Sequence, residues 1–325
     1  MRLCRYQQNG RPQVGLYDDK FVIPLAAALE AYSNATSDKQ KLPEGDNLLD
    51  FLPPDGQAFA ATKKIADWVA GHADAVPVSA RLEIGKIELL VPIPRPNKLL
   101  LLAGNYNEHI TEGGGRATAR AETFPYVFMK PPSTALADPG KPVVIPNISP
   151  DHIDWELELG IVIGRKARHV CEPEALHYVA GYTVVNDISD RKFRPNPERK
   201  QRDNDKWFDW EHGKWHDTFA PCGPCIGSAD AIPDPQKLKM KLSLNGKVKQ
   251  DATTAQQIFP VAAVVAFISQ IVTLEPGDII ATGTPAGVGN ATGTYLQAGD
   301  KMEAWIEGIG TLVSPVVDEE APKQK

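Results

Sequence analysis

The sequence predicts an α+β protein in which a small N-terminal α/β domain precedes a larger domain. Three observations lead to this prediction. Glycine and proline are frequent, with 26 and 28 residues, which favours many turns and short strands over a helical bundle. Residues 151–164 alternate with a period of two, as a packed strand does. The longest apolar run, residues 258–268, is too short to span a bilayer and predicts a buried helix over about 255–272.

The composition of the 325 residues is typical of a soluble globular protein, with 42% hydrophobic and 23% charged residues. A net charge of −6 gives no reason to expect a nucleic-acid partner. The first residues lead straight into polar sequence, so we expect neither a targeting signal nor a membrane partner. Four cysteines do not make a disulfide framework at this length, which favours a reducing, cytoplasmic location.

A cluster of prolines divides the chain. Three prolines between residues 92 and 96 interrupt any regular element, so we place a domain boundary there. Residues 1–91 then form the small N-terminal domain, which shows no pattern that points to chemistry. We expect the larger domain to span residues 92–317 and residues 318–325 to be a disordered tail.

Local patterns predict the remaining elements in chain order. Apolar or alternating runs bounded by turn residues indicate strands, and longer segments of helical pattern indicate helices. The alternation around Asn245 and Gly246 is the clearest of these patterns and predicts a hairpin with one solvated face. The predicted strands lie at 3–6, 14–17, 98–103, 124–130, 143–145, 181–191, 238–250 (the hairpin), 279–282 and 301–306, and the predicted helices at 24–32, 58–70 and 170–179.

The strand predicted at 151–164 carries two carboxylates on one face. The other face carries large apolar side chains. Glu156 and Glu158 share their face with Gly160, Val162 and Gly164. Two like charges this close repel each other unless a proton or a cation neutralises them. Mg²⁺, Mn²⁺ or Ca²⁺ would suit such oxygen ligands. The alternative is an ordinary acidic strand at the surface.

Two further segments carry polar side chains next to apolar strands. If a helix begins at Asn105, His109 and Glu112 lie on one helical face, where a carboxylate can orient an imidazole as a general base. The alternative is a surface ion pair, and residues 105–122 are either a lid or a mobile loop. Asp187 follows an apolar strand, where an isolated acid is unfavourable unless it is paired or binds a metal ion.

Residues 192–217 mix charged residues with four aromatic side chains. We interpret this segment as an exposed insertion whose aromatic side chains line a pocket, pack on a partner subunit or anchor a loop. The four are Trp207, Phe208, Trp210 and Trp215.

The tetrapeptide CGPC, from Cys222 to Cys225, matches the thioredoxin dithiol motif. That chemistry needs the first cysteine at a helix N-terminus, and the sequence that follows does not predict a long helix. A zinc site would need a second pair of ligands, but Cys4 and Cys171 are far apart in sequence. We favour neither interpretation. Residues 283–289 are glycine-rich but lack the Lys-Ser/Thr of a P-loop.

Taken together, these segments resemble the fumarylacetoacetate hydrolase family. The matching motifs occur in family order over residues 98–310. They are 104–112 (GNYNEHITE), 128–131 (FMKP), 156–160 (ELELG), 181–189 (GYTVVNDIS), 213–214 (GK), 217–221 (DTFAP), 244–246 (LNG), 274–278 (LEPGD), 282–285 (TGTP) and 287–289 (GVG). The resemblance implies a catalytic domain made of a mixed β-sheet rolled into a barrel-like core with flanking helices, which usually forms a homodimer.

The resemblance also implies roles for individual residues. A divalent cation, Mg²⁺ or else Mn²⁺ or Ca²⁺, would be held by three carboxylates, and a histidine–glutamate pair would activate water. A lysine would bind or polarise the substrate. The implied metal ligands are Glu156, Glu158 and Asp187, the catalytic residues His109, Glu112 and Lys214, and the substrate-binding residues Tyr106, Lys130, Arg191, Gln250 and Thr284.

We therefore expect a metal-dependent hydrolase that cleaves the C–C bond of a 2,4-dioxo acid, such as an acylpyruvate, to pyruvate or a related keto acid and a carboxylic acid. The alternatives on the same fold are a decarboxylase for oxaloacetate-like acids, a hydratase or an isomerase, and a silent binding protein. The chain departs from the family pattern at Trp215, where Ser is common, at 189–192 and in a longer insertion at 192–212. These departures concern the identity of the substrate more than the metal site.

Overall fold

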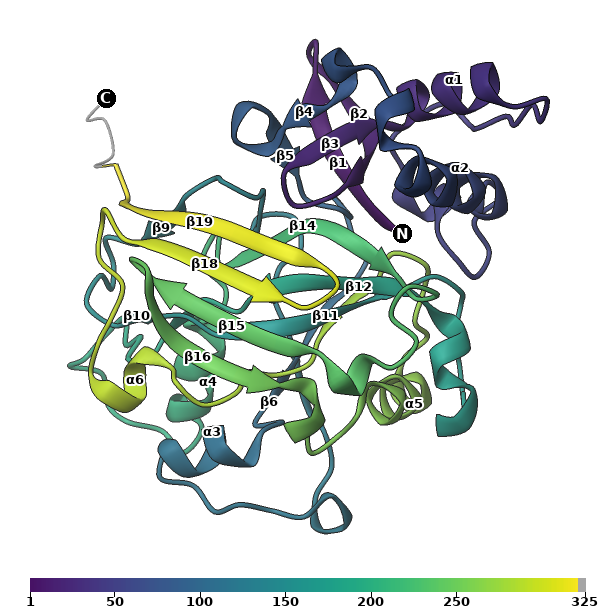
Figure 1. Ribbon diagram of the computed structural model, residues 1–325. Helices are drawn as coiled ribbons and strands as arrows, with labels where there is room; N and C mark the ends of the chain where they lie inside the picture. The colour runs from purple at the N-terminus through teal and green to yellow at the C-terminus, as the bar shows by residue number, and fades with distance from the viewer. Residues whose placement is uncertain (321–325) are drawn as a thin grey trace.

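The computed structural model describes residues 1–320 and contains a twelve-stranded, a five-stranded and a two-stranded β-sheet, with helices at their flanks (Figure 1). The strands are β1 (Arg2–Gln8), β2 (Arg11–Tyr17), β3 (Phe21–Pro24), β4 (Leu82–Glu83), β5 (Glu88–Leu90), β6 (Leu99–Ala103), β7 (Tyr126–Met129), β8 (Leu136–Ala137), β9 (Val143–Ile145), β10 (Ile153–Asp154), β11 (Leu157–Ile163), β12 (Val179–Asn186), β13 (Ser189–Asp190), β14 (Ala220–Ser228), β15 (Lys239–Leu244), β16 (Lys247–Thr253), β17 (Ile279–Ala281), β18 (Lys301–Ile306) and β19 (Gly310–Asp318). The α-helices are α1 (Leu25–Ala35), α2 (Phe59–Gly71), α3 (Asn107–Glu112), α4 (Asp205–His212), α5 (Val261–Ile271) and α6 (Gly289–Thr292).

The larger sheet has twelve strands, and its main path runs β4-β3-β2-β1-β14-β12-β11-β17-β6-β7. Its strands are mixed in direction, because β6 pairs with β17 in parallel and β11 pairs with β12 and β17 antiparallel. The predicted α+β class with a mixed sheet is therefore confirmed. The predicted barrel-like core is not a closed barrel: within residues 1–320 the path ends at β4 and β7.

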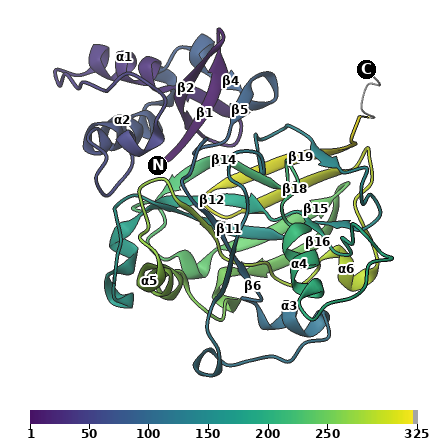
Figure 2. The same ribbon diagram turned by 180° about the vertical axis from the view of Figure 1, so that it is seen from behind.

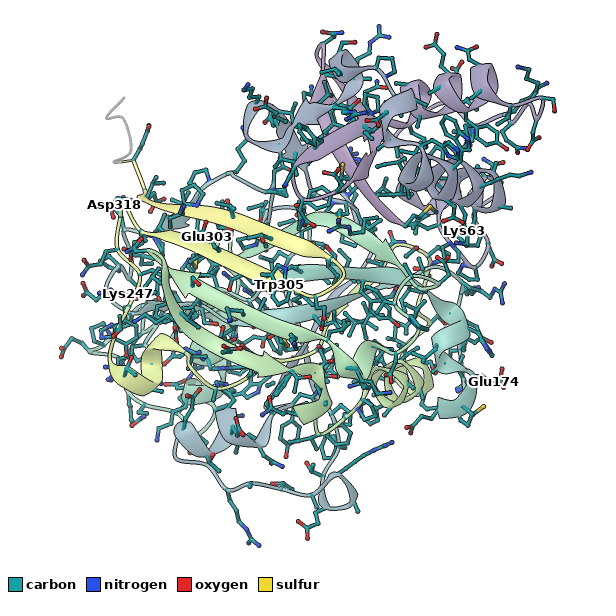
Figure 3. The ribbon with its side chains drawn as sticks, in the orientation of Figure 1. Lys63, Glu174, Lys247, Glu303, Trp305 and Asp318 are labelled. Carbon is teal, nitrogen blue, oxygen red and sulfur yellow. The ribbon has the colours of Figure 1, made fainter. Side chains whose placement is uncertain are left out.

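The second sheet has five strands in the order β16-β15-β18-β19-β9. It contains the predicted hairpin, in which Asn245 and Gly246 have φ angles of 50° and 76°, as a two-residue type I′ turn requires. Alternate residues of β18 are buried, and Figure 3 shows Glu303 and Trp305 on the outer face of this sheet. The strand period of two thus separates core from solvent here.

The strand β11 lies deep in the molecule, with hydrogen-bonded neighbours on both sides. Its apolar residues with odd numbers belong to the main hydrophobic core, and Val162 on the opposite face belongs to a second core cluster. Every residue of β11 is buried. The alternative of an acidic surface strand is therefore wrong, because both faces of β11 are covered.

The first 90 residues form a unit of their own strands and two helices, drawn in purple and blue in Figure 1. Its sheet continues into the larger sheet through β1, where Arg2 pairs with Gly227 and Leu3 with Ile226 of β14. The predicted strands and helices of this unit are present. Whether residues 1–91 fold as an independent domain stays a prediction.

Several elements differ from the expectations. The single strand predicted at 151–164 is two strands, β10 and β11, with Trp155 and Glu156 between them. The helix predicted at 170–179 is a 3₁₀ helix, Glu172–Tyr178, because β12 begins at Val179. The predicted buried helix begins only at Val261, after Pro260, which lacks the N–H needed inside a helix. The predicted tail begins later than residue 318, since Asp318 ends β19 and the N–H of Glu319 donates to the carbonyl of Ile145 at 3.0 Å. The remainder of that tail, 321–325, lies outside the described residues.

The CGPC motif lies inside β14, a strand that the sequence did not predict. Cys222 pairs with Val185 of β12, and both Cys222 and Cys225 are fully buried. Burial raises the pKa of Cys222 to about 12, which suppresses its thiolate form. Neither cysteine stands at a helix N-terminus, so the thioredoxin interpretation has no structural basis.

No helix within residues 1–320 is long and apolar enough to cross a membrane.

Candidate functional site

Three carboxylates meet at one end of the β11–β12 pair. The two strands are antiparallel with Leu157 opposite Asn186, so the segment before β11 and the residue after β12 lie side by side. The N–H of Asp187 donates to the carbonyl of Glu156 at 2.8 Å, which fixes this register. One carboxylate oxygen from each of Glu156, Glu158 and Asp187 lies within 4.8 Å of the other two, and all three residues are buried.

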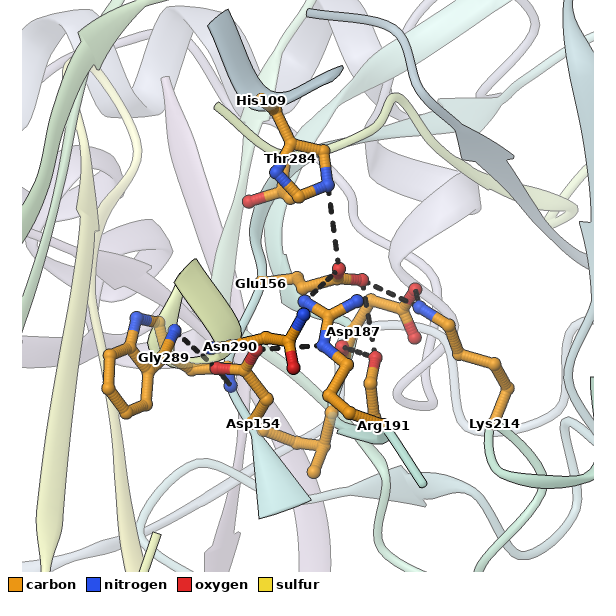
Figure 4. A network of polar contacts seen from close by, with 12 residues as sticks. His109, Asp154, Glu156, Asp187, Arg191, Lys214, Thr284, Gly289 and Asn290 are labelled. Atoms are coloured by element: carbon orange, nitrogen blue, oxygen red, sulfur yellow. Dashed lines mark hydrogen bonds and ion pairs between the residues drawn. The ribbon is translucent and has the colours of Figure 1, made fainter. Parts of the chain in front are cut away.

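Three cationic side chains surround these carboxylates, and Figure 4 shows two of them, Arg191 and Lys214, beside Glu156 and Asp187. The ammonium group of Lys214 lies 2.6 Å from Oε2 of Glu156 and 2.5 Å from Oδ2 of Asp187. The guanidinium of Arg191 lies 2.6 Å from Oε1 of Glu156, on the side away from Lys214. Behind them, Nζ of Lys130 lies 2.5 Å from Oδ1 of Asp187 and donates to two backbone carbonyls.

The positive charges are distributed unevenly over the three carboxylates. Burial would raise the pKa of Glu156, but Arg191 and Lys214 outweigh it and hold this pKa well below its usual value. Burial and the charges of Asp187 and Glu156 instead raise the pKa of Glu158 well above its usual value. Glu158 accepts a backbone N–H from Gly283 at 2.7 Å.

The pKa values of the two lysines, Lys214 and Lys130, are shifted in opposite directions. Burial would lower the pKa of Lys214, but the charges of Asp187 and Glu156 outweigh it, and this pKa is raised. Burial lowers the pKa of Lys130 to about 8, despite the charge of Asp187. Lys214 therefore keeps its positive charge beside the carboxylates at neutral pH.

The carboxylate cluster fits a hard divalent cation. It offers three oxygen ligands from buried side chains in one small space, the donor set that Mg²⁺ and Mn²⁺ prefer. A cation there would also relieve the repulsion that raises the pKa of Glu158. Glu156, Glu158 and Asp187, the three acids predicted from the sequence, are thus brought together in a group that could hold a metal ion.

The helix α3 presents a histidine to this cluster. His109 and Glu112 lie three residues apart, and Nδ1 of His109 is 2.8 Å from Oε1 of Glu112. The second oxygen of Glu112 accepts the N–H of Gly287 at 2.8 Å. The hydrogen bonds from His109 and Gly287 outweigh burial and lower the pKa of Glu112. Nε2 of His109 points to Glu156 and lies 3.9 Å from its Oε1 (Figure 4).

A small cavity of about 70 Å³ joins these groups. Its wall combines the charged side chains of the cluster with backbone and apolar surface. The residues that line it are Leu102, Ala103, Gly104, His109, Phe128, Glu156, Glu158, Arg191, Trp210, Lys214 and Thr284. The helices α3, α4 and α6 gather at this end of the molecule, away from the N-terminal unit, in both ribbon views (Figure 1, Figure 2).

Some of the predicted substrate-binding residues lie behind the cavity wall. The carboxamide of Gln250 accepts the N–H of Leu157 at 3.0 Å and donates to Thr284 and to the carbonyl of Pro285, both at 2.8 Å. The hydroxyl of Tyr106 lies 3.3 Å from Sδ of Met240. Tyr106, Lys130 and Gln250 do not line this cavity, whereas Arg191 and Thr284 do.

One residue of this network was missed in the sequence. Asp154 pairs with Nε of Arg191 at 2.7 Å and accepts the backbone N–H groups of Gly289 and Asn290 at 2.6 and 3.0 Å (Figure 4). It thereby connects Arg191 to the start of α6. The signal was present, because a period of two places residue 154 on the same face as Glu156.

Comparisons with known proteins show similar sequences over most of the chain. The model of the fumarylacetoacetate (FAA) hydrolase C-terminal family matches residues 98–317. The 2,4-didehydro-3-deoxy-L-rhamnonate hydrolase of Sphingomonas sp. strain SKA58 is 43% identical over 224 residues, covering 68% of this chain and 73% of that protein. The human mitochondrial oxaloacetate tautomerase FAHD2A is 36% identical over 247 residues, covering 75% of this chain and 73% of that protein.

A solved structure extends the similarity to the N-terminal unit. The crystal structure of maleylpyruvate hydrolase from Sphingobium sp. SYK-6, in complex with manganese(II) and pyruvate, has a TM-score of 0.69 and 27% identity, and the match covers 98% of this chain and 100% of that chain. The ordered motifs, the shared fold and the sequence identities together show that the chain belongs to the fumarylacetoacetate hydrolase family.

Proposed function

We propose that this enzyme is a divalent-metal-dependent hydrolase that cleaves the C–C bond of a 2,4-dioxo acid of the acylpyruvate type, releasing pyruvate or a related keto acid and a carboxylic acid. The observation that carries the proposal is the His109–Glu112 pair, which aims Nε2 of His109 at the buried carboxylate cluster. Two of the similar proteins support it, because they are named as hydrolases, of 2,4-didehydro-3-deoxy-L-rhamnonate and of maleylpyruvate.

A divalent cation held by Glu156, Glu158 and Asp187 would supply Lewis acidity toward the keto-acid end of the substrate. His109, with its Nδ1–H held by Glu112, accepts a proton from water at Nε2, and Glu112 stabilises the imidazolium that forms. The hydroxide attacks the carbonyl carbon C4. When the C3–C4 bond breaks, its electron pair delocalises into the 2-keto group, and C3 takes the proton back from His109.

Lys214 is placed to stabilise the oxygen at C4. An ammonium group has three donors, and two of them are directed at Glu156 and Asp187. The third remains for the oxygen that gains negative charge after the attack. Lys214 lines the cavity and is buried, so this interaction takes place away from bulk water, where such hydrogen bonds are strongest.

The proposal is tested by measuring pyruvate release from 2,4-dioxopentanoate with Mn²⁺ or Mg²⁺ and again after EDTA. We expect metal-dependent release of pyruvate and acetate in equal amounts. Pyruvate from oxaloacetate with CO₂, and none from the dioxo acid, would make the enzyme a decarboxylase. Undiminished turnover in EDTA would contradict the role of the three carboxylates.

A second candidate uses the same proton transfer without attack by water. The human relative is named an oxaloacetate tautomerase, and His109 could move a proton between carbon and oxygen of an enol in this way. The decay of enol-oxaloacetate absorbance separates the two reactions. Acceleration of that decay, with no acid released from any 2,4-dioxo acid, would favour tautomerisation over hydrolysis.

A further inference from the structure

An apolar groove of about 600 Å³ lies next to the small charged cavity. It is formed by the strand β7 and the loop before it, the helix α4 and the end of α5. None of its lining residues carries a charge. They are Ala103, Phe124, Pro125, Tyr126, Val127, Phe128, Trp207, Trp210, Phe267 and Ile271. Its size is within the range of ligand pockets, roughly 300–1,000 Å³.

The groove and the charged cavity share a wall. Ala103, Phe128 and Trp210 line both, and the rings of Phe128 and Trp210 meet edge to face with centroids 4.9 Å apart. Nζ of Lys214 lies 5.2 Å from the ring centroid of Phe128 and 5.8 Å from that of Trp210. The charged end of Lys214 therefore lies against the two aromatic rings that the cavity and the groove share.

This placement sets the direction of a bound substrate. In the proposed function the carboxylate and 2-keto end lies at the three acids, and Lys214 binds the oxygen on C4. The acyl substituent on C4 is then within reach of Phe128 and Trp210 and extends toward the groove. An aromatic or aliphatic group would be removed from water there, which is favourable in proportion to its apolar area.

A second carboxylate on the substrate would find no free cation in these cavities. The other adjoining cavity, about 290 Å³, is lined by His109, Arg191 and Glu112 among others. The guanidinium of Arg191 is already paired with Asp154 and Glu156, and His109 is the proposed base, held by Glu112. The geometry thus disfavours a dicarboxylate and favours an uncharged acyl group.

We propose that the groove between β7, α4 and α5 is the acyl pocket, and that the enzyme prefers acylpyruvates whose acyl group is an uncharged aromatic or aliphatic chain of several carbons. This assignment rests on the proposed function and narrows its substrate class. It also assigns a role to two of the four aromatic residues of the 192–217 segment, since Trp207 and Trp210 lie on the groove wall.

The first test compares three substrates with the wild-type enzyme in saturating Mn²⁺. They are 2,4-dioxopentanoate, with an acetyl group, 2,4-dioxo-4-phenylbutanoate, with a benzoyl group, and succinylpyruvate, whose acyl group ends in a carboxylate. We expect kcat/KM for the benzoyl compound to exceed the other two by tenfold or more. Equal values, or a preference for succinylpyruvate, would overturn the acyl pocket and leave the hydrolase proposal standing. Release of pyruvate from none of the three would overturn both.

The second test places a charge in the groove. Ile271 is 65% exposed on the groove wall, and Ile148, which is 64% exposed, lies outside the groove and serves as a matched control. Ile271→Glu should lower kcat/KM for the benzoyl compound at least tenfold and leave the acetyl compound within twofold. Ile148→Glu should change neither value.

Light scattering of the same variants separates the acyl pocket from a protein interface. We expect Ile271→Glu to keep the molecular mass of the wild type. An equal loss of activity toward both substrates together with a lower mass would show that a second copy of the chain covers the groove, and would overturn the proposal.

Discussion

The carboxylate of Glu112 ties the helix α3 to the N–H of Gly287, at 2.8 Å, while its other oxygen contacts His109 at the same distance. Both oxygens of the Glu112 carboxylate therefore have a partner. The carboxylate is fixed in place, and it fixes the orientation of the His109 ring. Both contacts need an acceptor, because Gly287 donates an N–H and Nδ1 of His109 must carry its proton for Nε2 to act as a base. A carboxylate meets both demands, and an amide can meet only one.

The first prediction follows from these two contacts. Glu112→Gln should lower kcat about 100-fold or more, the usual contribution of general acid–base catalysis, with little change in Mn²⁺ affinity. Steady-state kinetics and a Mn²⁺ titration measure the two quantities. Glu108→Gln, on the same helix, is the control and should retain activity, since the Glu108 carboxylate accepts from the exposed Gln256 and does not line the cavity. Full activity of Glu112→Gln would contradict the base assignment.

The second prediction concerns metal removal. Glu158→Gln should lose metal binding and turnover together, because it removes one of three oxygen charges from the cluster. Mn²⁺ should raise the Tm of the wild type, since a ligand that binds only the folded state stabilises it, and EDTA should reverse the shift. The variant should show no shift. Glu303→Gln, on the outer face of the second sheet, is the control. A variant that still turned over in EDTA would refute the mechanism.

The third prediction concerns the role of Gln250. Its amide satisfies the buried N–H of Leu157 and the carbonyl of Pro285. Gln250→Leu leaves both unpaired and should lower the free energy of unfolding by about 1–3 kcal/mol for each buried group. Urea denaturation measures the loss. The exposed Gln297, replaced by Leu in the same way, should lose far less. Equal losses would mean that the buried hydrogen bonds contribute nothing.

The fourth prediction tests the buried cysteines. Burial raises the pKa of Cys4, Cys222 and Cys225, so their thiolates are scarce at pH 8. A disulfide reagent should label the exposed Cys171 rapidly and the other three only after unfolding. Cys222→Ser with Cys225→Ser should keep metal-dependent turnover wherever the variant folds. Rapid labelling of all four thiols in the native protein would revive a redox role for CGPC.

Local patterns in the sequence were sufficient for several parts of this site. The period of two around Glu156 and Glu158 predicted that the two acids lie together, although only Glu158 is in β11 and Glu156 directly precedes it. The spacing of His109 and Glu112 predicted their contact. The turn at Asn245 and Gly246 was predicted because Asn and Gly readily adopt the positive φ angles that a type I′ turn requires. Each of these features depends on neighbours within a few residues, which the sequence shows directly.

Other parts depended on contacts between distant segments. The helix α4 was not predicted, because charged residues hide its short apolar stripe, and Trp210 reaches the cavity only through packing against Phe128. The strand β14 was not predicted because it contains glycines and prolines, which are unusual in a strand. The sequence also could not exclude an acidic surface strand, because that exclusion depends on the burial of both faces of β11 in the folded chain.

The sequence alone thus determined which side chains are candidates for the site and which of them share a local face, since a strand or helix period is a property of consecutive residues. The tertiary structure decided which residues from distant segments lie next to them. The register of β11 against β12 brings Asp187 to Glu156, and the fold brings Lys130, Arg191 and Lys214 around them. The physical reason is that burial and charge at a site are sums over every segment that packs there, and these sums exist only once the chain has folded.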